Sequence, residues 1–111
     1  MSRFSATARD FVRDGCNEVY VSAATAWEIA FKYGKNRLEL PEVPQLYMAN
    51  RLAHHFVGLP VQISHAAHVY TLPQIHADPF DRLLIAQSQS EGLPHLTADS
   101  MIRRYNVTII W

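Results

Sequence analysis

The 111-residue chain lacks several features that would assign it to a common class of protein. It has one cysteine, Cys16, which excludes an internal disulfide framework and makes a reducing cytoplasm the expected location. No apolar run approaches the roughly 18 residues that would span a bilayer, so a membrane protein is excluded. Ten basic and ten acidic side chains cancel, so any contact with a nucleic acid must be local.

The patterns typical of nucleotide-binding loops and of the hydrolase nucleophile elbow are also missing. His65 and His68 would share one face of a helix, but no further ligands follow at the spacing of a zinc site. No linker or low-complexity tract divides the chain. Its length therefore predicts a single domain that covers residues 1–111.

Runs of apolar residues alternate with cap and turn signals along the chain. Ser22, Ser64 and Asp78 are predicted N-caps, and Gly34 and Gly92 are predicted to close the helices that end beside them. Helices are expected at residues 5–14, 23–33, 42–56 (opened by Pro41), 65–72, 78–92 (begun by Asp78-Pro79) and 99–105. Strands are expected at residues 18–21, 59–63, 93–97 and 107–111.

Apolar strands that alternate with helices predict an α/β fold, with a parallel sheet covered on both faces. Sites in such sheets lie at the carboxyl ends of the strands. Glu28 lies in the second turn of the helix after the first strand, Asp81 follows the Asp78 cap, and Asp99 follows the strand at 93–97. We expect these three carboxylates to converge at one edge of the sheet.

Clustered carboxylates repel one another, and Mg²⁺ or Mn²⁺ removes that penalty. Such an ion would activate water and stabilise charge on a phosphate, so the pattern indicates a metal-dependent phosphodiesterase. Each carboxylate also has a structural interpretation. Asp99 could be an N-cap, Asp81 the partner in a capping box begun by Asp78, and Glu28 the i,i+4 partner of Lys32.

Several segments together resemble the PIN-domain toxins of the VapC group, and the match covers nearly the whole chain from about Ser5. These segments are residues 19–22, 27–30, 38–41, 76–87, 91–99 and 105–111. The string Asp-Pro-Phe-Asp-Arg at 78–82, followed by Thr-Ala-Asp at 97–99, is a specific signal of that group.

The resemblance implies a three-layer α/β/α domain that cleaves RNA, such as tRNA or mRNA, with Mg²⁺ or Mn²⁺ and a water nucleophile. A cognate antitoxin would inhibit it. The acidic positions of the family correspond to Glu28, Asp81 and Asp99. Thr97 corresponds to a polar residue that supports the site, and Arg82 to one that orients a carboxylate or contacts phosphate.

The chain departs from the family at its start. Family members open with an apolar strand that ends in Asp-Thr and lies in the middle of the sheet, whereas Met1 here falls after that strand. Its loss would remove the first metal ligand and expose two sheet edges, so a homodimer or higher oligomer is expected if Met1 is the true start of the protein. The alternative is a start codon that is assigned too late. The alternative function is a catalytically inactive PIN remnant that acts by binding the antitoxin or itself.

Overall fold

The computed structural model describes residues 6–13, 18–54, 56–96 and 101–110. The chain falls into two compact units, here called the central unit (Glu18–Val61) and the flanking unit (Met1–Asn17 with Gln62–Trp111). The predicted single domain over 1–111 stays a prediction. No helix in the described segments is long and apolar enough to cross a bilayer.

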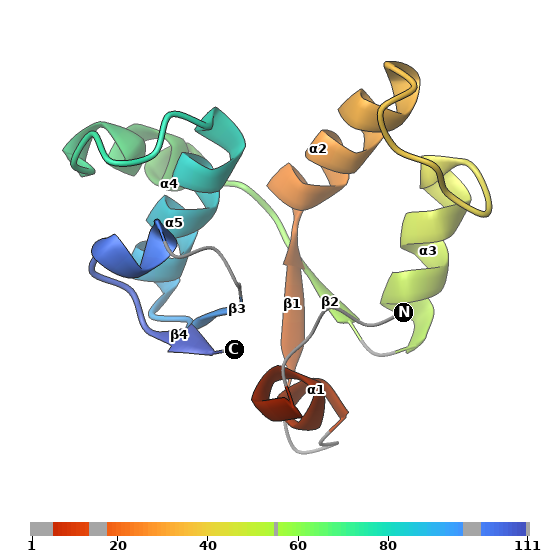
Figure 1. Cartoon of the computed structure of the whole chain (residues 1–111), viewed down its shortest axis with the longest axis horizontal. Coiled ribbons are helices and arrows are strands. Elements are labelled where there is room, and N and C mark those ends of the chain that lie inside the picture. The colour runs from red at the N-terminus through yellow and green to blue at the C-terminus, as the bar shows by residue number, and fades with distance from the viewer. Residues whose placement is uncertain (1–5, 14–17, 55, 97–100, 111) are drawn as a thin grey trace. The chain divides into compact units, whose positions relative to one another are not determined.

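The central unit is a strand–helix–helix–strand segment (Figure 1). Its elements are β1 (Val19–Ser22), α2 (Ala23–Gly34), α3 (Pro44–His54) and β2 (Phe56–Leu59). β1 and β2 pair in parallel, with Val19 opposite Phe56 and Ser22 opposite Leu59. α3 packs against both α2 and β2, so the two helices are held to the strand pair.

Ser22 begins α2 as predicted, because its side-chain oxygen accepts a hydrogen bond from the Ala24 N–H at 3.0 Å. The predicted end of this helix is wrong in one respect. Gly34 is the last helical residue, and the left-handed conformation belongs to Asn36, with φ of 57°. Asparagine is one of the few side chains that adopt this conformation readily.

The boundary between the third helix and the second strand is also corrected. The helix begins at Pro44 rather than beside Pro41 and ends at His54, and residues 56–59 form β2 instead of residues 59–63. Phe56 and Val57 suit a strand, and pairing with β1 satisfies the backbone there. This pairing joins residues more than thirty positions apart, so local periodicity does not reveal it.

The flanking unit contains α1 (Ala6–Arg13), α4 (Ile63–His68), α5 (Pro79–Glu91), two short strands and two 3₁₀ turns. The strands β3 (His95–Leu96) and β4 (Ile109–Ile110) pair in parallel. The turns η1 (Val69–Thr71) and η2 (Ile102–Arg104) lie between the longer elements along the chain. α4 packs on α5, and its N-cap is Gln62, not the predicted Ser64.

The core of the flanking unit forms around α5. The buried apolar side chains of this cluster are Leu72, Ile85, Ala86, Ile102 and Tyr105. α5 has the predicted start and end, with Asp78 as N-cap and Gly92 in the left-handed conformation at φ of 66°. α5 itself contributes Ile85 and Ala86 to this buried cluster, which anchors the helix to the core of its unit.

The structure confirms the α/β class and the parallel pairing of strands. The described strands form two separate two-stranded sheets, β1–β2 and β3–β4, where one continuous sheet was predicted. Among the described residues no strand pairs with the second edge of β1 or of β3. The three-layer arrangement and the missing first strand stay predictions.

Candidate functional site

The first turn of α5 holds Asp81, one of the three predicted carboxylates. The side chain of Asp78 caps this turn by accepting hydrogen bonds from the N–H groups of Phe80 (2.8 Å) and Asp81 (3.3 Å). Pro79 at the first helical position needs no acceptor for its nitrogen. This local sequence explains why Asp81 lies in the first turn, one residue before the buried Arg82.

His76 holds the carboxylate of Asp81. The distance from His76 Nε2 to Asp81 Oδ2 is 3.0 Å, and the two side chains are 15% and 26% exposed. The backbone N–H of Asp78 donates to Nδ1 of the same ring at 3.2 Å. In a capping box Asp81 would accept from the Asp78 N–H, but here the His76 ring accepts from it instead. Asp81 therefore remains a candidate metal ligand.

Arg82 is buried, and its guanidinium is tied to the protein. It donates to the carbonyl oxygens of Pro73 (2.9 Å) and Val69 (3.2 Å), and lies 3.5 Å from the hydroxyl of Tyr105. These contacts fasten the segment before α5 to the core. The phosphate contact and the carboxylate contact predicted for Arg82 find no support in these hydrogen bonds.

Glu28 belongs to α2 in the central unit. Its carboxylate forms an ion pair of 2.8 Å with Lys32 Nζ, one turn along the helix. The i,i+4 pair with Lys32 that the sequence offered as the structural interpretation of Glu28 is therefore present. Because Lys32 is 46% exposed, this ion pair contributes little to stability. Because Glu28 and Asp81 lie in different units, their convergence stays a prediction.

Thr97 and Asp99 lie outside the described residues. Among the residues that the structure does describe, no group of three or more histidine, cysteine, aspartate or glutamate side chains is arranged to hold a metal ion. The predicted three-carboxylate site is therefore represented here by Asp81 and, separately, by Glu28.

The two histidines weighed as zinc ligands have other partners. His65 is almost fully buried, accepts from the Gln62 N–H at Nδ1 (3.0 Å) and donates from Nε2 to Glu91 (2.7 Å). His68 Nε2 lies 2.8 Å from the Gln89 side-chain oxygen. These contacts join α4 to α5.

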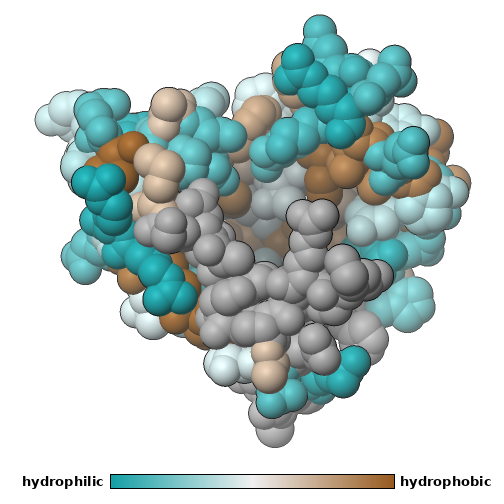
Figure 2. Space-filling view, viewed as in Figure 1, coloured by the Kyte–Doolittle hydropathy of each residue, from teal (hydrophilic) through white to brown (hydrophobic). Residues whose placement is uncertain are grey.

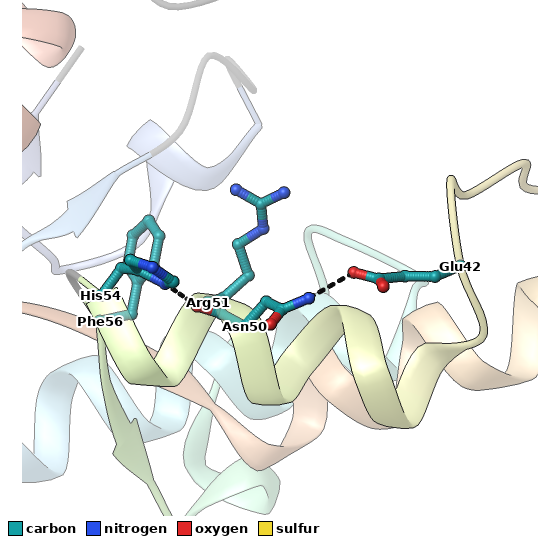
Figure 3. Close-up of a pocket in the computed structure, with 5 residues that line it drawn as sticks. All are labelled: Glu42, Asn50, Arg51, His54 and Phe56. Atoms are coloured by element: carbon teal, nitrogen blue, oxygen red, sulfur yellow. Dashed lines mark hydrogen bonds between the residues drawn. The ribbon is translucent and has the colours of Figure 1, made fainter.

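A cavity of about 360 Å³ lies in the central unit beside the end of α3 (Figure 3). Glu42 accepts from the Asn50 side chain at 2.6 Å, and His54 Nδ1 donates to the Asn50 carbonyl at 2.6 Å. Arg51 extends from the helix with its guanidinium over the Tyr47 ring, 4.6 Å from the centroid. None of the predicted site carboxylates lines this cavity.

Sequence reasoning missed His76 and Tyr105 as parts of the site. The Tyr105 hydroxyl accepts from the His76 N–H at 2.7 Å, across 29 positions of sequence. No local pattern marks such a pair. His76 had one available signal, because it opens the segment 76–87 that carries the most specific string.

Comparison with known families gives a match to nearly the whole chain. The model of the PIN domain matches residues 2–107, which includes Glu28, Asp81 and Asp99. A search of curated proteins found no match.

Proposed function

Because this chain belongs to the PIN-domain family, we propose that it is a ribonuclease of the VapC toxin type. PIN domains are in general metal-dependent nucleases. The finer assignment is supported by the string Asp-Pro-Phe-Asp-Arg at 78–82 with Thr-Ala-Asp at 97–99. The proposed reaction is hydrolysis of an RNA phosphodiester bond with water as the nucleophile.

The observation that carries this proposal is the placement of Asp81. Its carboxylate is partly exposed, lies in the first turn of α5 and is held by His76 at 3.0 Å. A partly exposed carboxylate at a helix start, with one oxygen held by a hydrogen-bond donor, is suited to receive a cation. Its neighbours Asp78 and Arg82 serve the helix start and the core, so their contacts leave this role to Asp81.

The donor set has the chemistry of a Mg²⁺ or Mn²⁺ site. Glu28, Asp81 and Asp99 would supply the hard oxygen ligands that these ions prefer, with Thr97 as a polar neighbour. The exposed Lys32 ammonium can leave Glu28 at little cost. The bound ion would lower the pKa of water and stabilise negative charge on the phosphate. The protein's own part is to orient these oxygens.

The proposed partners are RNA, such as tRNA or mRNA, a cognate antitoxin and further copies of the chain. The chain has no net charge, so RNA contact depends on local groups. Large apolar side chains are exposed on α2 and α3, and Figure 2 shows hydrophobic surface over this region. The most exposed of them are Trp27 (61%), Leu46 (57%) and Phe31 (46%). Exposed apolar surface of this kind favours a protein partner.

A second candidate function is a PIN protein without catalytic activity that acts by binding the antitoxin or itself. It is favoured by the fact that both described carboxylates already have protein partners. Glu28 is paired with Lys32 and Asp81 with His76. Each pair gives one oxygen of the carboxylate a protein partner.

Cleavage of RNA by the purified chain with Mg²⁺ or Mn²⁺ tests the proposal. Asp81→Asn keeps the size of the side chain but removes its charge. We expect it to lower the cleavage rate by more than roughly 100-fold, because even outer partners of metal ligands contribute about 10–100-fold. The same loss is expected for Asp99→Asn and Glu28→Gln.

Asp78→Asn is the matched control for this experiment. It makes the same chemical change three positions away, and asparagine is as good an N-cap as aspartate. We expect its cleavage rate to stay near that of the unmodified chain. Equal cleavage by the unmodified chain, Asp81→Asn and Asp99→Asn would contradict the proposed site. No cleavage by the unmodified chain would favour the binding function.

A further inference from the structure

The proton on the His76 ring has a defined position. Nδ1 lies 3.2 Å from the backbone nitrogen of Asp78, which can only donate, so Nδ1 must accept. In the neutral ring the proton is then on Nε2, the atom that lies 3.0 Å from Asp81 Oδ2. The ring thus accepts a hydrogen bond from the Asp78 N–H at Nδ1 and donates one from Nε2 to the Asp81 carboxylate. The neutral ring can make both hydrogen bonds at once.

The ring is attached to a rigid part of the molecule. The backbone N–H of His76 donates to the Tyr105 hydroxyl at 2.7 Å, and Tyr105 is buried in the core cluster. Arg82 holds the Pro73 carbonyl at 2.9 Å, three residues before His76. The segment before α5 is therefore fixed at two points, and the ring has little freedom to follow the carboxylate if the carboxylate moves.

Asp81 is also fixed through its own backbone. Its backbone lies in the first turn of α5, which is capped by Asp78 and followed by the buried Arg82. A carboxylate with a fixed backbone and one oxygen held by a fixed donor has few rotamers left. A donor that orients a metal ligand in this way is a common feature of metal sites, and its loss typically weakens metal affinity or activity by about 10–100-fold.

From these contacts we propose that His76 is a positioning residue, which holds the Asp81 carboxylate in the orientation that receives the divalent cation. This inference rests on the proposed function. His76 does not touch the metal in this arrangement, since both ring nitrogens are engaged by Asp78 and Asp81. Its effect on the reaction passes through the Asp81 carboxylate.

Two substitutions separate the two hydrogen bonds of the ring. In His76→Asn the side-chain amide reaches about as far as Nδ1, so it can accept from the Asp78 N–H but cannot reach Asp81. In His76→Gln the amide reaches about as far as Nε2, so it can donate to Asp81. If His76 only stabilises the helix start, the asparagine variant should behave more like the unmodified chain. If His76 positions Asp81, the glutamine variant should bind Mn²⁺ more like the unmodified chain.

The experiment compares the full chain with these two variants in three measurements. They are the melting temperature without metal, the Mn²⁺ concentration at the midpoint of its thermal stabilisation, and the rate of RNA cleavage. We expect the asparagine variant to melt near the unmodified chain without metal, yet to need about 10–100-fold more Mn²⁺ and to cleave correspondingly more slowly. The glutamine variant should need less Mn²⁺ than the asparagine variant.

The outcomes distinguish the inference from the function on which it rests. If the unmodified chain binds Mn²⁺ and cleaves RNA while the asparagine variant does both equally well, positioning by His76 is wrong. An equal loss of Mn²⁺ affinity in both variants also overturns it. If the unmodified chain neither binds Mn²⁺ nor cleaves RNA, the proposed function itself fails. Long-range ¹H–¹⁵N NMR spectra of the metal-free chain should show the proton on Nε2, and a proton on Nδ1 would refute the geometry.

Discussion

At the scale of single residues, three neighbours in one stretch of sequence have three different tasks. Asp78 caps α5, Asp81 presents a carboxylate beside His76, and Arg82 turns its charge inward to carbonyl groups and to Tyr105. Their spacing on the helix separates these tasks, because side chains at successive positions point in different directions. Asp81 and Arg82 can therefore be tested independently.

Arg82→Met should destabilise the flanking unit. The substitution keeps most of the apolar stem but removes every guanidinium donor, leaving the carbonyls of Val69 and Pro73 without this partner. Each carbonyl keeps one backbone donor, the Leu72 N–H on Val69 and the Ile75 N–H on Pro73, but loses its hydrogen bond to a charged group. Because such a hydrogen bond contributes about 1.5–3 kcal/mol, we expect the free energy of unfolding to fall by about 3 kcal/mol. Urea denaturation followed by circular dichroism measures this change.

Arg103→Met is the control, since Arg103 is exposed on the η2 turn. Exposed substitutions of this kind usually change stability by no more than about 0.5 kcal/mol. If the two variants unfolded at the same urea concentration, Arg82 would not be the anchor of the segment before α5.

At the scale of elements, local signals determine where α2 and α5 begin. Ser22 and Asp78 were predicted as N-caps and are N-caps, because a side-chain oxygen beside free backbone N–H groups acts over two or three residues. Long-range contacts decide other boundaries. β2 begins at Phe56 because it pairs with β1, more than thirty positions away. The start of α4 after Gln62 is again local, because His65 accepts from the Gln62 N–H three residues before it.

The two helix-terminal glycines provide a test at this scale. Gly92 has φ of +66°, whereas Gly34 is helical and no atom lies within 4 Å of a Cβ added there. Gly92→Ala should lower the free energy of unfolding by about 1 kcal/mol, because a left-handed conformation strains an L-residue. Gly34→Ala should raise it by about 0.5 kcal/mol, because alanine loses less entropy on folding. Thermal unfolding of both variants measures the two changes in the free energy of unfolding. Changes of the same sign would contradict the left-handed conformation at Gly92 or the helical conformation at Gly34.

At the scale of the whole molecule, the candidate ligands are divided between two units. Glu28 belongs to the central unit and Asp81 to the flanking unit. The proposed cation would stabilise the folded chain, since any ligand that binds the folded state alone shifts the unfolding equilibrium. The PIN-family match spans both units, from residue 2 to residue 107.

Mn²⁺ should therefore raise the melting temperature of the chain. At a concentration 100 times Kd, such binding contributes about 2.7 kcal/mol. Glu28→Gln and Asp99→Asn should each abolish the shift. Glu39→Gln makes the same change at an exposed residue of the central unit and should keep it. Differential scanning calorimetry measures the shift, and an equal shift in all four proteins would show that the ion binds elsewhere.

The sequence by itself determined the α/β class, the parallel strands, the start of α5 and the family, because these depend on periodicity, caps and a short string of residues around Asp81. Only the tertiary structure decided that Arg82 is buried, that β2 pairs with β1 from Phe56, and that His76 holds Asp81 while Tyr105 holds His76. The physical reason is the distance along the sequence over which each interaction acts. A cap acts over two or three residues, whereas the hydrogen bond between His76 and Tyr105 exists only once the chain has packed.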